Sequence, residues 1–182
     1  MSRPQISHEV ELLDLNVMPF PVLAHVARLI DGSKAVTAPL SSMAATCRLE
    51  APRVRHSLRE LSALGCLRVA FAGPSAHVAL TDLTRGALVT PAWVDGAGLS
   101  PAAVRVLFHH AQHPDDKQAA WDVGAALRLS PTHVRDGERE LITRRLLEPR
   151  GWSQRSFVVT PPSAGAVAEV QDVNTRKGVC VT

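Results

Sequence analysis

One pattern of residues occurs twice in this chain, 80 positions apart, and it limits the possible folds more than any other feature. The two copies, residues 45–67 and 125–147, align without a gap and share apolar positions as well as arginines. The matched pairs are Ala45 with Ala125, Arg48 with Arg128, Leu49 with Leu129, Val54 with Val134, Arg55 with Arg135, Arg59 with Arg139, Glu60 with Glu140, Leu61 with Leu141 and Leu67 with Leu147. Two copies at so long a period indicate a duplicated small domain and not a solenoid.

The first copy predicts the end of a short helix, a turn, a longer helix and a strand. Pro52 stands in the first turn of the longer helix, where a missing N–H is tolerated, and Gly65 follows its end. Apolar residues at helical spacing mark the buried side of this helix: Val54, Leu58, Leu61 and Leu64. Alternating apolar residues then predict a half-buried strand: Leu67, Val69 and Phe71.

The two copies belong to longer units with the same order of elements. In residues 21–81 we expect helices over 21–30, 39–49 and 52–64, a short extended link at 36–39, and strands at 67–71 and 77–80 joined by a turn at 72–75. In residues 100–161 we expect a helix capped by Ser100, helices over 118–129 and from 132 onward, an interruption at 148–151 and a strand at 156–160.

Three further segments lie outside these units. Residues 82–99 form a short linker whose apolar side chains are expected to pin the two units together. Residues 1–20 and the C-terminal helix and tail at 162–182 carry apolar residues at 10–17 and 167–173. We expect these ends to pack together or to form a two-fold dimer contact; packing of residues 10–17 against the first unit is the alternative.

Three helices followed by a hairpin resemble the winged helix-turn-helix domains of bacterial regulators such as the MarR and PadR families. The resemblance implies a mainly α fold with small β-hairpins (α+β), built as two tandem winged-helix domains joined by a short apolar linker. It also implies that the third helix of a unit lies in the major groove of double-stranded DNA.

Carried over to this chain, the resemblance assigns DNA contacts to both units. The third helix of the first unit supplies Arg53, Arg55, His56 and Arg59, and its second helix supplies Ser41, Ser42 and Thr46 for phosphates. The second unit supplies His133, Arg135 and Arg139 from its third helix, and Arg150 and Arg155 from its hairpin. Arginine can donate to the edge of guanine or to phosphate oxygens.

Charge favours the first unit as the DNA reader. Residues 21–81 hold seven Lys/Arg and three Asp/Glu, a balance of +4, whereas residues 101–161 hold nine and seven, a balance of +2. Asp136 and Glu138 are expected to lie close to phosphates and to repel them. We therefore expect Arg55→Ala to weaken DNA binding more than Arg135→Ala.

Other classes of function have weaker support. No phosphate-binding glycine loop, carboxylate pair or nucleophile motif indicates an enzyme, and no cofactor is expected. His109, His110 and His113 form a histidine cluster, but surface imidazoles are a better interpretation than a metal site. Cys47 and Cys66 stand at apolar positions and are expected to be buried thiols. With three cysteines, no signal peptide and no membrane-length apolar run, we expect a cytoplasmic, nucleoid-associated protein.

Three hypotheses about function stay open at this point. The first is a bacterial or mobile-element transcriptional regulator that binds double-stranded DNA, as a homodimer. The second is a plasmid or phage replication initiator or partition protein. The third is a winged-helix scaffold that docks a protein partner in a chromosome-organising complex, since the same fold serves several functions.

Overall fold

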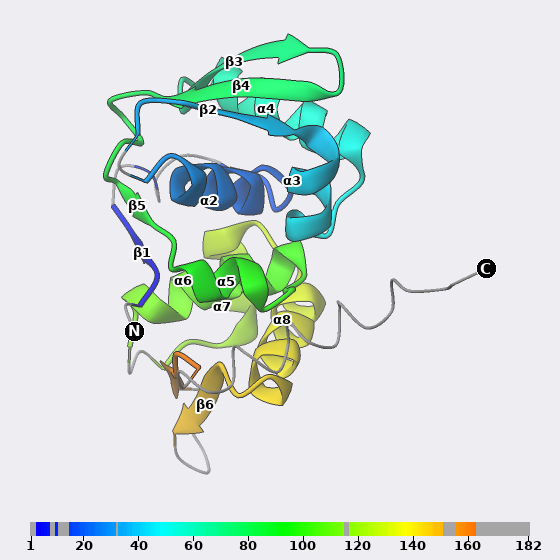
Figure 1. Ribbon diagram of the computed structural model, residues 1–182. Helices are drawn as coiled ribbons and strands as arrows, with labels where there is room; N and C mark the ends of the chain where they lie inside the picture. Colours follow the sequence, from blue (N-terminus) through cyan, green and yellow to red (C-terminus); the bar gives the residue numbers. More distant parts are fainter. Residues whose placement is uncertain are drawn as a thin grey trace, which may run out of the picture.

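The computed structural model describes residues 3–7, 10, 15–31, 33–114, 117–150 and 156–162, as a mixture of helices and small antiparallel sheets (Figure 1). The first half of the chain contains α2 (Pro19–Leu29), β2 (Val36–Pro39), α3 (Leu40–Cys47), α4 (Ala51–Ala63), β3 (Leu67–Ala72) and β4 (Ser75–Leu80). The second half contains α6 (Pro101–Gln112), α7 (Ala120–Leu127), α8 (Pro131–Thr143), β6 (Leu147–Arg150) and β7 (Ser156–Val159). Between and before them lie β1 (Gln5–Ile6), β5 (Leu88–Val89) and α5 (Ala92–Gly96).

The repeat in the sequence is also a repeat in the structure. The bounds of α3 and α7 differ by 80 positions at both ends, and so do those of α4 and α8. Arg48 and Arg128 both follow the shorter helix with a left-handed backbone, at φ 51° and 53°. The following amides donate to equivalent carbonyls, from Leu49 N to Ala44 O at 2.9 Å and from Leu129 N to Gly124 O at 2.8 Å.

The longer helices α4 and α8 also end in the same way. Gly65 and Arg145 follow them with φ of 74° and 58°, a conformation that costs a residue with a side chain roughly 1–2 kcal/mol. The next amide then donates back to the last turn in both halves at 2.9 Å, from Cys66 to Leu61 O and from Leu146 to Leu141 O. The geometry is conserved between the halves, although only the first half uses a glycine for it.

This difference between the halves gives a matched pair of stability predictions. We expect Arg145→Gly to raise the free energy of unfolding by about 1 kcal/mol, because it removes the left-handed strain from an exposed position. Gly65→Ala is expected to lower it by about the same amount. Urea unfolding of both variants tests the pair, and a loss of stability in Arg145→Gly would contradict the strain argument.

The sheets correct two expectations. Residues 36–39 are not a simple link, because β2 pairs with β4 as the third strand of a sheet ordered β2-β4-β3, with Val36 opposite Val78. Residues 148–150 do not interrupt the second unit, because they belong to β6, where Pro149 stands opposite Phe157. Among the described residues β6 pairs only with β7, so a residue without an N–H is tolerated on its other edge.

Several helix bounds differ from those expected. α2 begins at Pro19, two positions before the expected start at residue 21, and α7 begins at Ala120, two positions after the expected start at residue 118. α3 ends at Cys47, since the left-handed backbone of Arg48 stops the helix there. The cap of α6 is confirmed, because the Ser100 hydroxyl accepts from Ala103 N at 3.3 Å.

The segment at 82–99 is folded against both halves. β5 pairs with β1, α5 lies below α2 in the view of Figure 1, and Arg144 of the second half donates to Gly98 O at 3.2 Å. Trp93 and Val94 are buried, as expected from their apolar character. Asp95 on α5 accepts from His25 Nδ1 at 2.8 Å and pairs with Arg28, both on α2. This linker therefore positions α5 against the first half.

The two halves also contact each other directly. The Phe20 and Phe108 rings of α2 and α6 meet edge to face, with centroids 5.2 Å apart, and the Arg105 guanidinium lies 4.6 Å from the Phe20 centroid. A second contact between the halves involves Arg48, which follows α3. It lies 3.3 Å from the Glu140 carboxylate on α8 and donates to Gly98 O at 3.1 Å. Aromatic and charged contacts together fix the halves relative to each other.

The N-terminal segment packs within the chain. Val10 and Leu15 are fully buried, and Asn16 donates to Glu60 on α4 at 2.7 Å. These apolar residues therefore have partners inside the same molecule, whereas residues 167–173 lie outside the described part of the chain. Among the helices that the structure describes, none has the length and apolar character to cross a membrane.

Candidate nucleic-acid interface

The outer face of α4 gathers positive charge. Its inner face buries Val54, Leu58 and Leu61 completely, so the helical period turns other residues outward. Arg53, His56 and Arg59 are exposed on that outer side. The only acidic residue within the bounds of α4 is Glu60, which accepts from Asn16 and lies 3.9 Å from His56 Nε2. The first two turns of the helix thus present Arg53 and Arg55 without a carboxylate on the same turns, whereas Arg59 directly precedes Glu60.

Phe71 on β3 joins this helix to the hairpin β3–β4. The guanidinium carbons of Arg55 and Arg59 lie 4.6 Å and 5.4 Å from the Phe71 ring centroid, within the range of cation–π contact. Arg55 also donates from Nη2 to Gly73 O at 2.7 Å, in the turn of the hairpin. Arg55 therefore holds the hairpin against α4, in addition to any contact that its remaining donors make.

Helix α3 contributes polar residues beside α4. Ser41 and Ser42 are exposed in its first turn. Thr46 is half-buried, and its hydroxyl donates to Ser42 O at 3.2 Å within the helix. The two serines are therefore placed for contacts from outside, whereas the proton of the Thr46 hydroxyl is already used.

The second half presents a weaker positive surface on α8. His133 Nδ1 lies 2.9 Å from the Ser130 hydroxyl that caps the helix, and Arg135 is exposed. Arg139 is paired with Asp136 at 2.8 Å, which offsets its charge. Arg150 is exposed on β6, and Arg155 lies outside the described residues. The position that matches Arg59 thus carries less unbalanced charge here, whereas Arg135, which matches Arg55, is exposed.

Glu138 does not lie where the sequence suggested. It was expected near phosphates, but it is buried, with 4% exposure, on the inner face of α8. Its Oε1 lies 3.4 Å from Nε2 of His110 on α6, and His110 is also buried. The pair is close enough for electrostatic attraction, although these two atoms lack hydrogen-bond geometry. Glu138 therefore belongs to the packing between α6 and α8 and not to an outer surface.

The histidine cluster on α6 is mostly interior, so its interpretation as surface imidazoles was wrong for two of its members. His109 and His110 are buried and His113 is half-buried. His109 Nε2 lies 2.6 Å from the Gln118 side-chain oxygen, and its ring centroid is 4.6 Å from that of His113. Within the described residues, no three His, Cys, Asp or Glu side chains are grouped to hold a metal ion.

Both described cysteines are buried, as the sequence predicted. Burial, with a smaller contribution from the Asp95 charge, raises the pKa of the Cys47 thiol from 9.0 to about 12. Burial also raises the pKa of Cys66. The thiolate is the reactive form, so neither position suits a nucleophile at neutral pH.

These pKa shifts predict slow thiol chemistry in the folded protein. In a Cys180→Ser variant at pH 8, we expect iodoacetamide to modify Cys47 and Cys66 slowly without urea and rapidly with it. Stability should fall as the pH rises above 9.0, because the unfolded Cys47 thiol then ionises while the folded one stays protonated up to about pH 12. Mass spectrometry counts the modified thiols, and rapid native modification of Cys47 would contradict its burial.

One exposed aromatic residue was not among the predicted site residues. Trp121 on α7 is 67% exposed, at the position that matches Ser41 in the first half. Asp122 occupies the position of Ser42 and is also exposed. The alignment of the two copies would have shown this change from two hydroxyl side chains to an aromatic ring and a carboxylate.

Comparisons with known proteins do not settle what this surface binds. Neither a protein-family model, nor a curated protein, nor a solved structure matches this chain. The assignment of a function therefore rests on the residues of α3, α4 and the hairpin themselves.

Proposed function

We propose that this chain binds double-stranded DNA through a winged helix-turn-helix unit in residues 21–81, with a second such unit in residues 100–161. The observation that carries the proposal is the outer face of α4 beside a hairpin, where Arg53, His56 and Arg59 are exposed and Glu60 is the one acidic residue of the helix. An α-helix fits the major groove of B-DNA, and arginine is the side chain that most often reads guanine there.

In this proposal each element of the first half has a role. α4 enters the major groove with Arg53 and His56 near base edges, and Arg59 follows further along the helix. Ser41 and Ser42 donate to phosphates from α3. Arg55 and Phe71 fix the angle between the hairpin and α4, so the hairpin reaches the backbone beside the groove. The second half plays a smaller part in binding, because Asp136 offsets Arg139.

A binding titration tests the proposal directly. The full chain is titrated into a labelled pool of random duplexes at low and moderate salt, and bound duplexes are then selected and sequenced. Affinity should fall steeply with salt: the logarithm of the binding constant should decrease linearly with the logarithm of the salt concentration, with a slope of roughly −1 for each phosphate contact. Selection should enrich a site that contains guanine. Absence of duplex binding at low salt would refute the proposal.

The exposed Trp121 supports a second candidate function for the second half. An exposed tryptophan is common at protein interfaces, and Asp122 beside it would repel phosphate. A protein-docking role of this half is compatible with DNA binding by the first half. Replacement of Trp121 by serine, its counterpart in the first half, should leave DNA affinity unchanged if the two roles are separate.

The biological setting follows from where the DNA site lies. A selected sequence in a promoter favours a transcriptional regulator, whereas copies in a replication origin favour an initiator or partition protein. A palindromic sequence requires a two-fold dimer, so sedimentation of the full chain with and without the selected duplex completes the test.

A further inference from the structure

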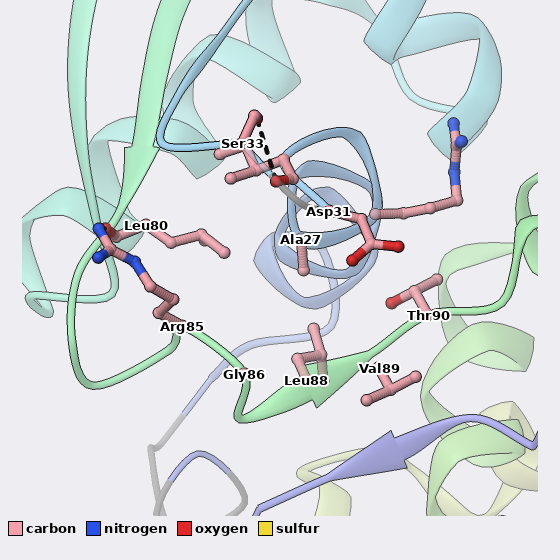
Figure 2. Close-up of a pocket in the computed structure, with 11 residues that line it drawn as sticks. Ala27, Asp31, Ser33, Leu80, Arg85, Gly86, Leu88, Val89 and Thr90 are labelled. Carbon is pink, nitrogen blue, oxygen red and sulfur yellow. Dashed lines mark hydrogen bonds between the residues drawn. The ribbon is translucent and has the colours of Figure 1, made fainter.

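A pocket of about 310 Å³ lies where the C-terminal end of α2 meets β5 and the end of β4 (Figure 2). Its volume is at the lower end of the range for small-molecule sites. Ala27, Leu80 and Leu88 supply apolar walls. The pocket is separate from the outer face of α4, so its residues have no part in the DNA interface proposed above.

Thr90 is the feature that distinguishes this pocket from an ordinary surface hollow. It lines the pocket, it is 8% exposed, and its hydroxyl has no hydrogen-bond partner among the described residues. Nearby Thr84 is also buried, but its hydroxyl donates to Cys66 O. A buried polar group without a partner costs free energy unless something supplies that partner. A bound molecule in the pocket is positioned to do so.

The charges around the pocket define which kind of molecule fits. Arg28 is already paired with Asp95, so its charge is offset. Arg85 donates to Leu80 O at 3.3 Å, and the Asp82 carboxylate, 3.9 Å from its guanidinium, is fully exposed to water. Such a pair is weak, so the Arg85 guanidinium can accept an anionic group from a ligand.

The opposite side of the pocket fixes the orientation of that ligand. Figure 2 shows Asp31 and Thr90 on one side and Arg85 on the other, with Ala27 and Leu88 between them. An acid group next to Asp31 would be repelled, so it must lie at Arg85. An apolar body then covers Leu88, and a polar group at its far end approaches the Thr90 hydroxyl.

We propose that this pocket binds a small organic acid with an apolar body and a polar far end such as a hydroxyl, held by Arg85 at its carboxylate and by Thr90 at that hydroxyl. Since β5 begins the connection from the first half to α5, such a ligand would contact the segment that joins the two halves. The inference does not depend on DNA binding, and its test contains no DNA.

Calorimetric titration of the full chain with three molecules of similar shape tests the proposal. Hexanoate should bind at least about tenfold more tightly than hexanamide or hexylamine, the size expected for a charge-assisted contact. Arg85→Met should abolish this preference, whereas Asp31→Asn should leave hexanoate affinity unchanged or raise it. Equal affinity for the three molecules, no heat from hexanoate at millimolar concentration, or an unaffected Arg85→Met variant would each overturn the proposal.

Thr90 offers a second readout that separates binding from folding. Thr90→Val should weaken the binding of 6-hydroxyhexanoate several-fold and spare that of hexanoate, whose methyl end makes no hydrogen bond. It should leave the melting temperature equal or higher, because it removes a hydroxyl without a partner. Thr84→Val, the matched control, should lower the melting temperature and spare the affinity for both acids. If Thr90→Val lowers the melting temperature as Thr84→Val does, the hydroxyl has a structural partner and the assignment of Thr90 to the site is wrong.

Discussion

The double variant Arg53→Glu/Arg59→Glu is expected to lose DNA affinity by at least about a hundredfold. Each arginine contributes roughly 1–3 kcal/mol if it holds a guanine edge, and two glutamates would in addition repel phosphates. The two side chains are exposed on α4, so the fold should survive the change. The measurement is a titration with the selected duplex at two salt concentrations, with unfolding in urea as a check on stability.

The second half supplies the matched control. His133→Glu/Arg139→Glu alters the equivalent positions of α8 and should reduce affinity far less, because Asp136 already offsets Arg139. Equal losses in the two variants would mean that both helices contact DNA. No loss in the α4 variant would reject α4 as the reader and would favour a protein-docking role for both halves.

Arg55 needs a separate interpretation, because it has a structural role. Arg55→Ala is still expected to weaken binding more than Arg135→Ala, by roughly 1–3 kcal/mol if Arg55 holds a guanine. It also removes the hydrogen bond to Gly73 O and the contact with Phe71, so the hairpin would lose a support. A loss of stability alongside the loss of affinity would identify the hairpin support, whereas Arg53→Ala should change affinity alone.

The helical part of the fold could be predicted from local patterns. The spacing of Val54, Leu58 and Leu61 predicted the buried face of α4, and Ser100 predicted the start of α6. Leu64, expected on the same buried face, follows the last residue of α4 and is 39% exposed. The repeat predicted that α8 would follow the same course as α4. These features depend on residues within a few turns of each other, so the sequence alone contains them.

The pairing of distant segments could not be predicted in this way. β2 is a strand because Val36 lies opposite Val78, and β1 forms because it meets β5. Nothing within residues 5–6 or 36–39 specifies such partners. The role of Phe71 as a platform for arginines likewise depends on the angle between β3 and α4, which only the folded chain defines.

The sequence predicted Glu138 on the outer face of the helix, although its spacing from neighbouring apolar residues indicates the buried face. Val134, Glu138 and Leu141 follow each other at helical spacing, so they share the buried face of α8. The copy in the first half places Leu58 at the position of Glu138 and Ile30 at that of His110, and both of these residues are buried. A pair of an imidazole and a carboxyl group thus replaces an apolar pair at equivalent positions.

Breaking this buried pair is expected to destabilise the protein strongly. Glu138→Ala removes the carboxylate beside His110 and opens a cavity between α6 and α8, with an expected loss of about 3–5 kcal/mol in the free energy of unfolding. Glu138→Gln retains the shape and should lose less. Urea unfolding followed by circular dichroism measures both changes.

Converting the pair to the residues of the first half should restore the stability. Buried ion pairs are often no more stabilising than apolar side chains of similar volume, because taking charges out of water is costly. We therefore expect His110→Ile/Glu138→Leu to unfold within about 1 kcal/mol of the unmodified protein, or above it. If the double variant is as unstable as Glu138→Ala, the charges at this position are required by their surroundings, and the two halves differ in their cores as well as on their outer faces.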